Sequence, residues 1–138
     1  MTLKEEFIKL GYTEEDYEII RNNYAIINIK DETLIKKLKD NFAFFLKNGY
    51  TQEEVIKMTK SLPTIYGLSK ENMKQKIDFY DSIGMHALAV IDAKQLMQSV
   101  NLSYARYSFY MDKGINIDMN NYKKLFIGQK QFEKSYGI

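Results

Sequence analysis

The sequence contains no cysteine, only one proline and only one histidine among 138 residues. Without cysteine, disulfide bonds and thiolate metal sites are excluded. One proline and seven glycines are too few for an all-β domain, which needs many turn residues. No segment approaches the roughly 18 consecutive apolar residues that a membrane span requires. We therefore expect a helical, cytoplasmic protein without a membrane partner.

Catalytic and cofactor-binding motifs are missing as well. The phosphate-loop, dinucleotide-binding and nucleophile-elbow patterns do not occur. The single histidine, His86, has no second histidine or cysteine with which to hold a metal ion. The acidic cluster Glu14–Asp16 falls in the first turn of an expected helix, where negative charge complements the helix dipole. The first residues, MTLKEEFIKLGY, do not read as a signal peptide. We expect no enzyme, no cofactor and no metal site.

Four glycines recur in related contexts at intervals of 38, 35 and 30 residues, and each follows an aromatic residue by four positions. The glycines are Gly11, Gly49, Gly84 and Gly114, and the aromatics are Phe7, Phe45, Tyr80 and Tyr110. Apolar residues then follow the first three glycines at offsets of 6, 9 and 13, which is the spacing of one helical face. The pattern predicts a single domain of helix-pair repeats, with units at about 11–48, 49–83 and 84–113 and a cap at 114–138.

Each unit is expected to contain a short helix and then a longer one. The predicted helices cover 14–24, 32–47, 51–62, 70–82, 86–98, 103–113, 118–126 and 129–136. Thr13 and Thr51 are the expected N-caps, each with an acidic residue three positions later. Pro63 should end the second short helix and restrict Leu62. The fold class is all-α, a short α-solenoid in which each pair buries its apolar stripe against its neighbours.

Residues 48–84 carry a more specific pattern. Here Gly49-Tyr-Thr opens an acidic first helix, Pro63 lies fourteen residues after the glycine, and a second helix leads to Phe79 and Gly84. This stretch resembles the repeat of the mitochondrial transcription termination factor (mTERF) family. The resemblance implies stacked helix pairs with short 3₁₀ turns and a basic surface that follows duplex DNA or structured RNA. Three units make a short track, so a family-like footprint would need a homodimer or a protein partner.

The candidate phosphate contacts are lysines and one arginine on expected helix surfaces. They are Lys57, Lys60, Lys70, Lys74, Lys76, Arg106, Lys123, Lys124 and Lys130. Arg106 lies between two tyrosines in a C-terminal quarter with excess positive charge, and is the strongest single candidate. The alternative for the lysines is an ordinary solvated helix face. Tyr107, Tyr110 and Met111 have helical spacing and are expected in the core.

The leading hypothesis is a non-enzymatic protein, bacterial or from a mobile element, that binds DNA or RNA through backbone phosphates in transcription or mobile-element regulation. The alternative is an adaptor that binds a protein through exposed tyrosines. A continuous basic stripe through Lys57, Lys60, Lys74 and Arg106 would favour nucleic acid. Scattered charge beside an exposed aromatic patch would favour the adaptor.

Overall fold

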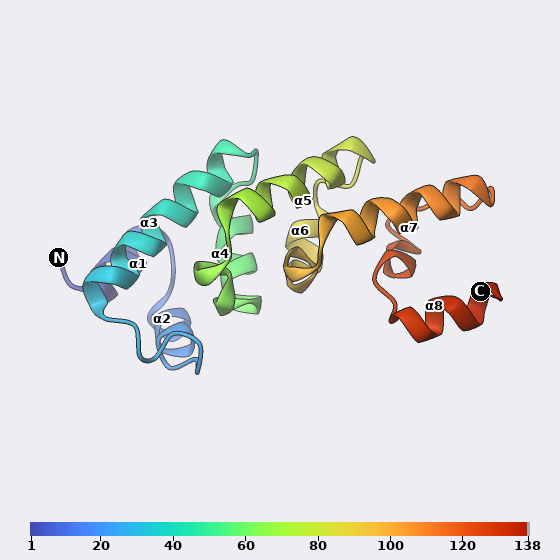
Figure 1. Cartoon of the computed structure of the whole chain (residues 1–138). Coiled ribbons are helices and arrows are strands. Elements are labelled where there is room, and N and C mark those ends of the chain that lie inside the picture. Colours follow the sequence, from blue (N-terminus) through green and yellow to red (C-terminus); the bar gives the residue numbers. More distant parts are fainter. Residues whose placement is uncertain (138) are drawn as a thin grey trace.

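A computed structural model describes residues 1–137 and shows an all-α helical array (Figure 1). In these residues no strand occurs and none of the helices is both long and apolar enough to cross a bilayer. The predicted fold class is confirmed. The elements in chain order are α1 (Leu3–Lys9), α2 (Glu14–Arg21), α3 (Asp31–Lys47), α4 (Gln52–Ser61), the 3₁₀ helix η1 (Pro63–Gly67), α5 (Lys70–Ser82), α6 (Leu88–Ile91), η2 (Ala93–Met97), α7 (Val100–Asp112), η3 (Tyr122–Leu125) and α8 (Gln129–Tyr136).

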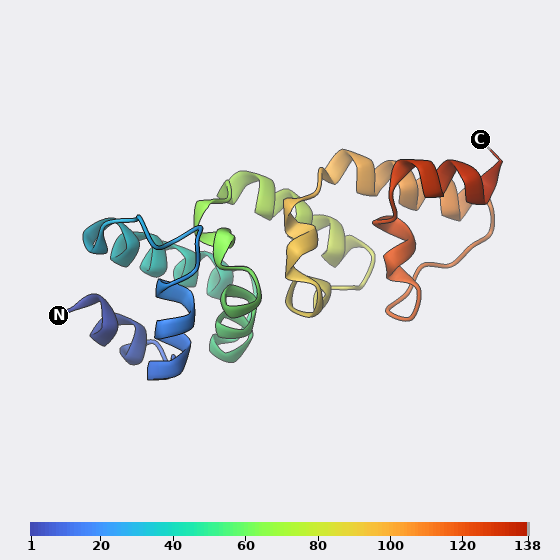
Figure 2. The same cartoon turned by 90° about the horizontal axis from the view of Figure 1, so that it is seen from below.

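The array is elongated, with the two termini at opposite ends (Figures 1 and 2). The long helices α3, α5 and α7 follow one another along one side, while α4 and α6 lie on the other side (Figure 1). A long helix therefore leads into a turn, and the turn leads to a short helix on the opposite side. This alternation is the arrangement that helix-pair repeats predict.

Every long or leading helix ends in the same backbone motif, which we call the glycine corner. The N–H after the glycine donates to the carbonyl of the aromatic residue five positions earlier. The four bonds are Tyr12 to Phe7 (3.2 Å), Tyr50 to Phe45 (3.1 Å), Met85 to Tyr80 (2.8 Å) and Ile115 to Tyr110 (2.8 Å). The corner glycines have φ between 72° and 105°, a left-handed conformation that is strained for other residues. The corner turns the chain and provides a hydrogen bond to a carbonyl at the end of the helix.

Threonine side chains cap the N-termini of α2 and α4, the helices that follow the first two corners. Thr13 and Thr51 accept from the backbone N–H three residues later, and Asp16 and Glu54 accept from the threonine N–H groups in return. Both are complete capping boxes. The second short helix ends at Ser61, and Pro63 begins η1, as predicted.

Three predicted helices are wrong in length or type. Helix 14–24 stops at Arg21, because that guanidinium donates to the carbonyls of Ile26 and Ile29 and so holds the next turn in a non-helical form. Helix 86–98 is broken at Asp92, whose φ of −138° and ψ of 66° nearly repeat those of Leu62 before Pro63. The 118–126 segment forms only a turn and η3.

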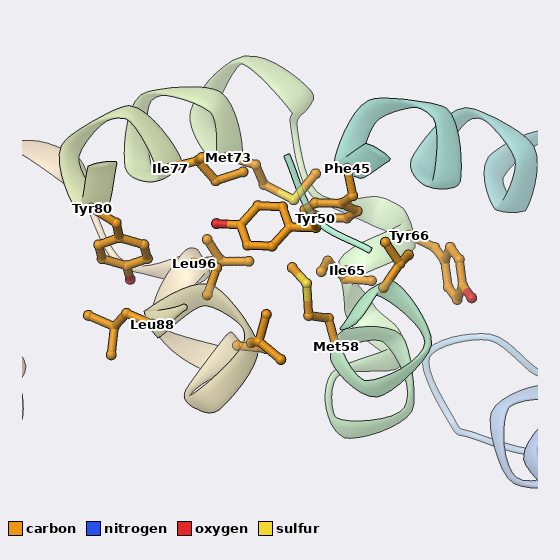
Figure 3. Packing of buried hydrophobic residues seen from close by; sticks show 14 of the residues in the cluster. Phe45, Tyr50, Met58, Ile65, Tyr66, Met73, Ile77, Tyr80, Leu88 and Leu96 are labelled. Carbon is orange, nitrogen blue, oxygen red and sulfur yellow. The ribbon is translucent and has the colours of Figure 1, made fainter. Parts of the chain in front are cut away.

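Neighbouring units share one continuous apolar core. Figure 3 shows Tyr50 among Met73 and Ile77 of its own unit and Leu96 of the next unit. The Tyr50 hydroxyl donates to the His86 carbonyl (2.9 Å), and its ring stacks on His86 at 4.0 Å between centroids. Burying one such side chain contributes roughly 1.5–3 kcal/mol. Stability therefore comes from contacts between units as well as within them.

The glycine corner can be tested with two glycines that differ mainly in φ. An ideal Cβ at Gly84 or at Gly67 would meet no atom within 4 Å, but only Gly84 has a positive φ. We expect Gly84→Ala to lower the free energy of unfolding by about 1 kcal/mol. Gly67→Ala should leave it within about 0.5 kcal/mol or raise it slightly, because alanine restricts the unfolded chain. Urea unfolding followed by circular dichroism measures both, and equal losses would argue against the role of φ.

Candidate nucleic-acid interface

Arg106 lies inside the array, which corrects its prediction as a phosphate contact. Its side chain is only 3% exposed. The guanidinium donates to the carbonyls of Ile127 (2.5 Å) and Leu125 (3.4 Å) and to Gln129 Oε1 (3.1 Å), and it packs over the Phe132 ring. Arg106 precedes the buried Tyr110 by four residues and therefore shares its inward face. That spacing was the signal in the sequence that pointed to burial.

Lys76 is corrected in the same way. It is fully buried on the inward face of α5, four residues before Tyr80. Its Nζ donates to Ser103 Oγ (2.6 Å) and to the Gln98 carbonyl (3.4 Å). Burial lowers the pKa of Lys76 to about 8. Neither buried cation can reach a ligand on the surface.

Lys60 and Lys74 are exposed, but each is already paired with a carboxylate. Lys60 Nζ lies 2.8 Å from Asp16 Oδ1 and bridges α4 to α2, and Lys74 Nζ lies 2.6 Å from Asp78 Oδ1 on the same helix. The hydrogen bond from Lys60, together with the Thr13 N–H, holds the pKa of Asp16 below its usual range. The stripe expected through Lys57, Lys60, Lys74 and Arg106 therefore does not form. Lys57 and Lys70 are exposed and have no ion-pair partner within residues 1–137.

Exposed lysines gather in the C-terminal unit, residues 115–137. Lys123 and Lys124 lie on η3, and Lys130 and Lys134 lie on α8; all four are exposed and without an ion pair in the described chain. A groove of about 570 Å³ separates these elements, and we call it the C-terminal groove. Its lining residues, none of them acidic, are Asn120, Asn121, Lys123, Lys124, Ile127, Gln131, Ser135 and Tyr136.

The fold directs Lys123 and Lys124 outward. They lie between Tyr122 and Leu125, which are both buried and anchor η3 on each side. The Tyr110 hydroxyl donates to the Lys124 carbonyl (2.7 Å) and fixes the backbone beneath the two ammonium groups. With the backbone held and both neighbours inward, the two lysine side chains point to solvent.

The family comparison covers nearly the whole array. The mTERF family model matches residues 2–133. The chain belongs to the mTERF family. The match includes the weakly patterned units on both sides of residues 48–84, on which the resemblance rested. Searches of curated proteins and of solved structures give no match.

The exposed aromatic residues of this mTERF protein lie apart from the lysine cluster. Tyr24 is 84% exposed and Tyr104 is 45% exposed. Of the three residues expected in the core, Tyr110 is buried as predicted and Tyr107 is half-buried. Met111 is exposed, so its prediction was wrong. The exposed residues of α7 therefore include the apolar side chains of Tyr104 and Met111.

The buried charge of Lys76 in this mTERF protein makes stability depend on pH. Between pH 8 and 10 the unfolded chain keeps Lys76 protonated, whereas the folded protein has released that proton. The free energy of unfolding of the wild type should therefore rise, relative to Lys76→Met, by up to about 1.4 kcal/mol per pH unit in this window. Urea titrations of both proteins from pH 7 to 10 measure this difference. A constant difference across the range would contradict the burial of an ammonium group.

Proposed function

We propose that this mTERF protein binds nucleic acid, duplex DNA or structured RNA, through backbone phosphates, and that the C-terminal groove is its main contact. The observation that carries the proposal is the presence of Lys123 and Lys124 in the lining of a groove without an acidic lining residue. The exposed Lys130 lies directly before Gln131, which lines the groove on α8. Membership of the mTERF family supports the choice of nucleic acid as the ligand. The protein acts as a binder without catalysis, in transcription or in regulation of a mobile element.

The groove offers two kinds of donor to a phosphate backbone. The lysine ammonium groups neutralise phosphates and release counterions, which makes affinity fall steeply with salt. Amide and hydroxyl side chains such as Asn120, Gln131 and Ser135 donate to phosphate or sugar oxygens and fix the register. Neither kind of contact distinguishes one base from another. Binding with weak sequence preference follows.

The remaining exposed candidate lysines fall into two groups. Lys57 and Lys70 are free to add phosphate contacts in the second unit. Lys60 and Lys74 contribute less, because each must first give up an interaction with a carboxylate. We therefore expect unequal effects when these lysines are replaced one at a time.

The second candidate function, an adaptor for a protein partner, would rest on a different surface. The specific observation in its favour is the exposure of Tyr104, Met97 and Met111, with no exposed charged side chain between Asn101 and Met111. Between Asn101 and Met111 this surface has no exposed cation to pair with a phosphate. Loss of nucleic-acid binding on replacing the lysines, with Tyr104→Ser unaffected, would separate the two functions.

The proposal is tested by a salt titration of binding with a pair of charge-matched variants. Fluorescence anisotropy would follow a labelled 20-base-pair DNA duplex and an RNA hairpin between about 25 and 200 mM salt, the range in which phosphate contacts are lost. Lys123→Ala with Lys124→Ala should weaken binding at low salt at least about tenfold and reduce the salt slope by about 2. The control, Lys4→Ala with Lys74→Ala, removes the same charge from two ion-paired positions.

The control pair should change affinity less than about threefold, since surface ion pairs contribute little. Equal losses in the two double variants would mean that only net charge matters, and the groove would lose its role. Absence of binding to both nucleic acids at the lowest salt would overturn the proposal as a whole.

A further inference from the structure

The side chain of Arg106 spans the linker that joins η3 to α8. Its three hydrogen-bond acceptors belong to Leu125 at the end of η3, Ile127 in the linker and Gln129 at the start of α8. Lys123 and Lys124 precede the linker directly, and Lys130 follows it directly. One buried side chain of α7 therefore holds the backbone that connects Lys123 and Lys124, on one side of the C-terminal groove, to α8, which lines the other side.

The same arrangement occurs one unit earlier. Lys76 lies eight residues before the corner glycine Gly84, and Arg106 lies eight residues before Gly114. Lys76 donates to the carbonyl of Gln98, directly after η2, just as Arg106 donates to the carbonyl at the end of η3. Two different cationic side chains at one repeat position thus bind the end of the next 3₁₀ helix. The contact belongs to the architecture and is not an accident of one side chain.

The first junction shows what happens where this contact is missing. The residue eight positions before Gly49 is Asn41, which is buried but too short to act in the same way. Its amide donates to Lys37 in its own helix, and its Oδ1 has no partner within residues 1–137. Here η1 is held from the preceding unit by another route, since Tyr66 OH lies 3.2 Å from Tyr12 OH. Each of the three 3₁₀ helices therefore has a polar anchor in the unit before it.

The charge of Arg106 is balanced by backbone dipoles. No carboxylate lies within ion-pair distance of the guanidinium in the described residues. Its partners are the last carbonyl of η3 at Leu125, the Ile127 carbonyl and the Gln129 side-chain oxygen, all of which carry partial negative charge. Removal of the guanidinium would leave buried carbonyl groups unpaired. The linker, and not the helices on either side, would then lose its support.

We infer that Arg106 is a positioning residue that holds residues 125–129 and thereby sets the placement of Lys123 and Lys124 relative to α8 across the C-terminal groove. The consequence for binding rests on the proposed function, whereas the structural role does not. Arg106 acts through the lysines and touches no ligand itself.

Amide hydrogen exchange tests the structural role. In Arg106→Met the amides of Lys124 and Phe126, which donate to Asn121 and Lys123, should exchange at least about tenfold faster. The amides of α4 should keep their wild-type rates. Lys76→Met is the matched control, because it removes the equivalent buried cation and should loosen the Gln98 amide while sparing Phe126. Arg106→Lys, which keeps a cationic donor as in the preceding unit, should restore part of the protection.

The binding measurement separates positioning from direct contact. If Arg106 positions the lysines, Arg106→Met should weaken binding of the DNA duplex about tenfold in the wild-type background. In the Lys123→Ala, Lys124→Ala background it should weaken binding less than threefold, because coupled residues are not additive. Equal losses in the two backgrounds, or unchanged exchange at Phe126, would overturn the inference. If wild-type protein bound no nucleic acid, the proposed function would fail while the exchange result still decided the structural role.

Discussion

The hydrogen bond that closes each glycine corner is the constraint on which the rest of the array depends. The N–H of the residue after the glycine donates to the carbonyl of a buried aromatic residue five positions earlier, and this bond turns the chain at the end of the helix. At the first two corners, the side chain of the residue that donates this bond packs against the next unit. At Tyr12 and Tyr50 its hydroxyl makes a hydrogen bond there, to Thr59 and Tyr66 in the first case and to the His86 carbonyl in the second. One local backbone motif thus fixes both the turn that leads from one unit into the next and a side-chain contact between units.

Stacking the units in this way leaves backbone carbonyls at the junctions that need hydrogen-bond donors. The carbonyls at the ends of η2 and η3 face buried side chains of the preceding unit, and a carbonyl left unpaired there would be costly. Lys76 and Arg106 donate to these carbonyls at the second and third junctions. The array therefore spends two of its cations on its interior, at positions where a helical surface would otherwise present them to a ligand. Lysine and arginine can thus either bind carbonyls in the interior or bind a ligand at the surface, and burial determines which of the two they do.

The sequence alone predicts those features that are determined by residues close together in the chain. Gly49 and its aromatic partner, the capping box at Thr51 and the stop at Pro63 are each set by neighbouring residues, so spacing alone predicted the helix pairs and the fold class. It was insufficient where the cause is distant: Asp16 and Lys60 meet across two helices, and nothing near Asp92 marks the break there. Lys76 and Arg106 were placed on the surface because of their charge, although each lies four residues before a core tyrosine. The position of each residue on the helix, relative to the buried tyrosine, predicts its burial better than its charge does.

The distribution of ion pairs explains why a protein with a formal charge of only +2 has a distinctly basic end. In the described chain, every ion pair made by a lysine or arginine joins residues between Lys4 and Asp78. Residues 4–78 contain as many acidic as basic side chains, so this part carries no net charge and projects little field. The C-terminal unit has acidic side chains only at Asp118 and Glu133, and both accept hydrogen bonds from neighbouring amide groups. Its lysines are left without counterions from the protein, and a polyanion can supply what the fold does not.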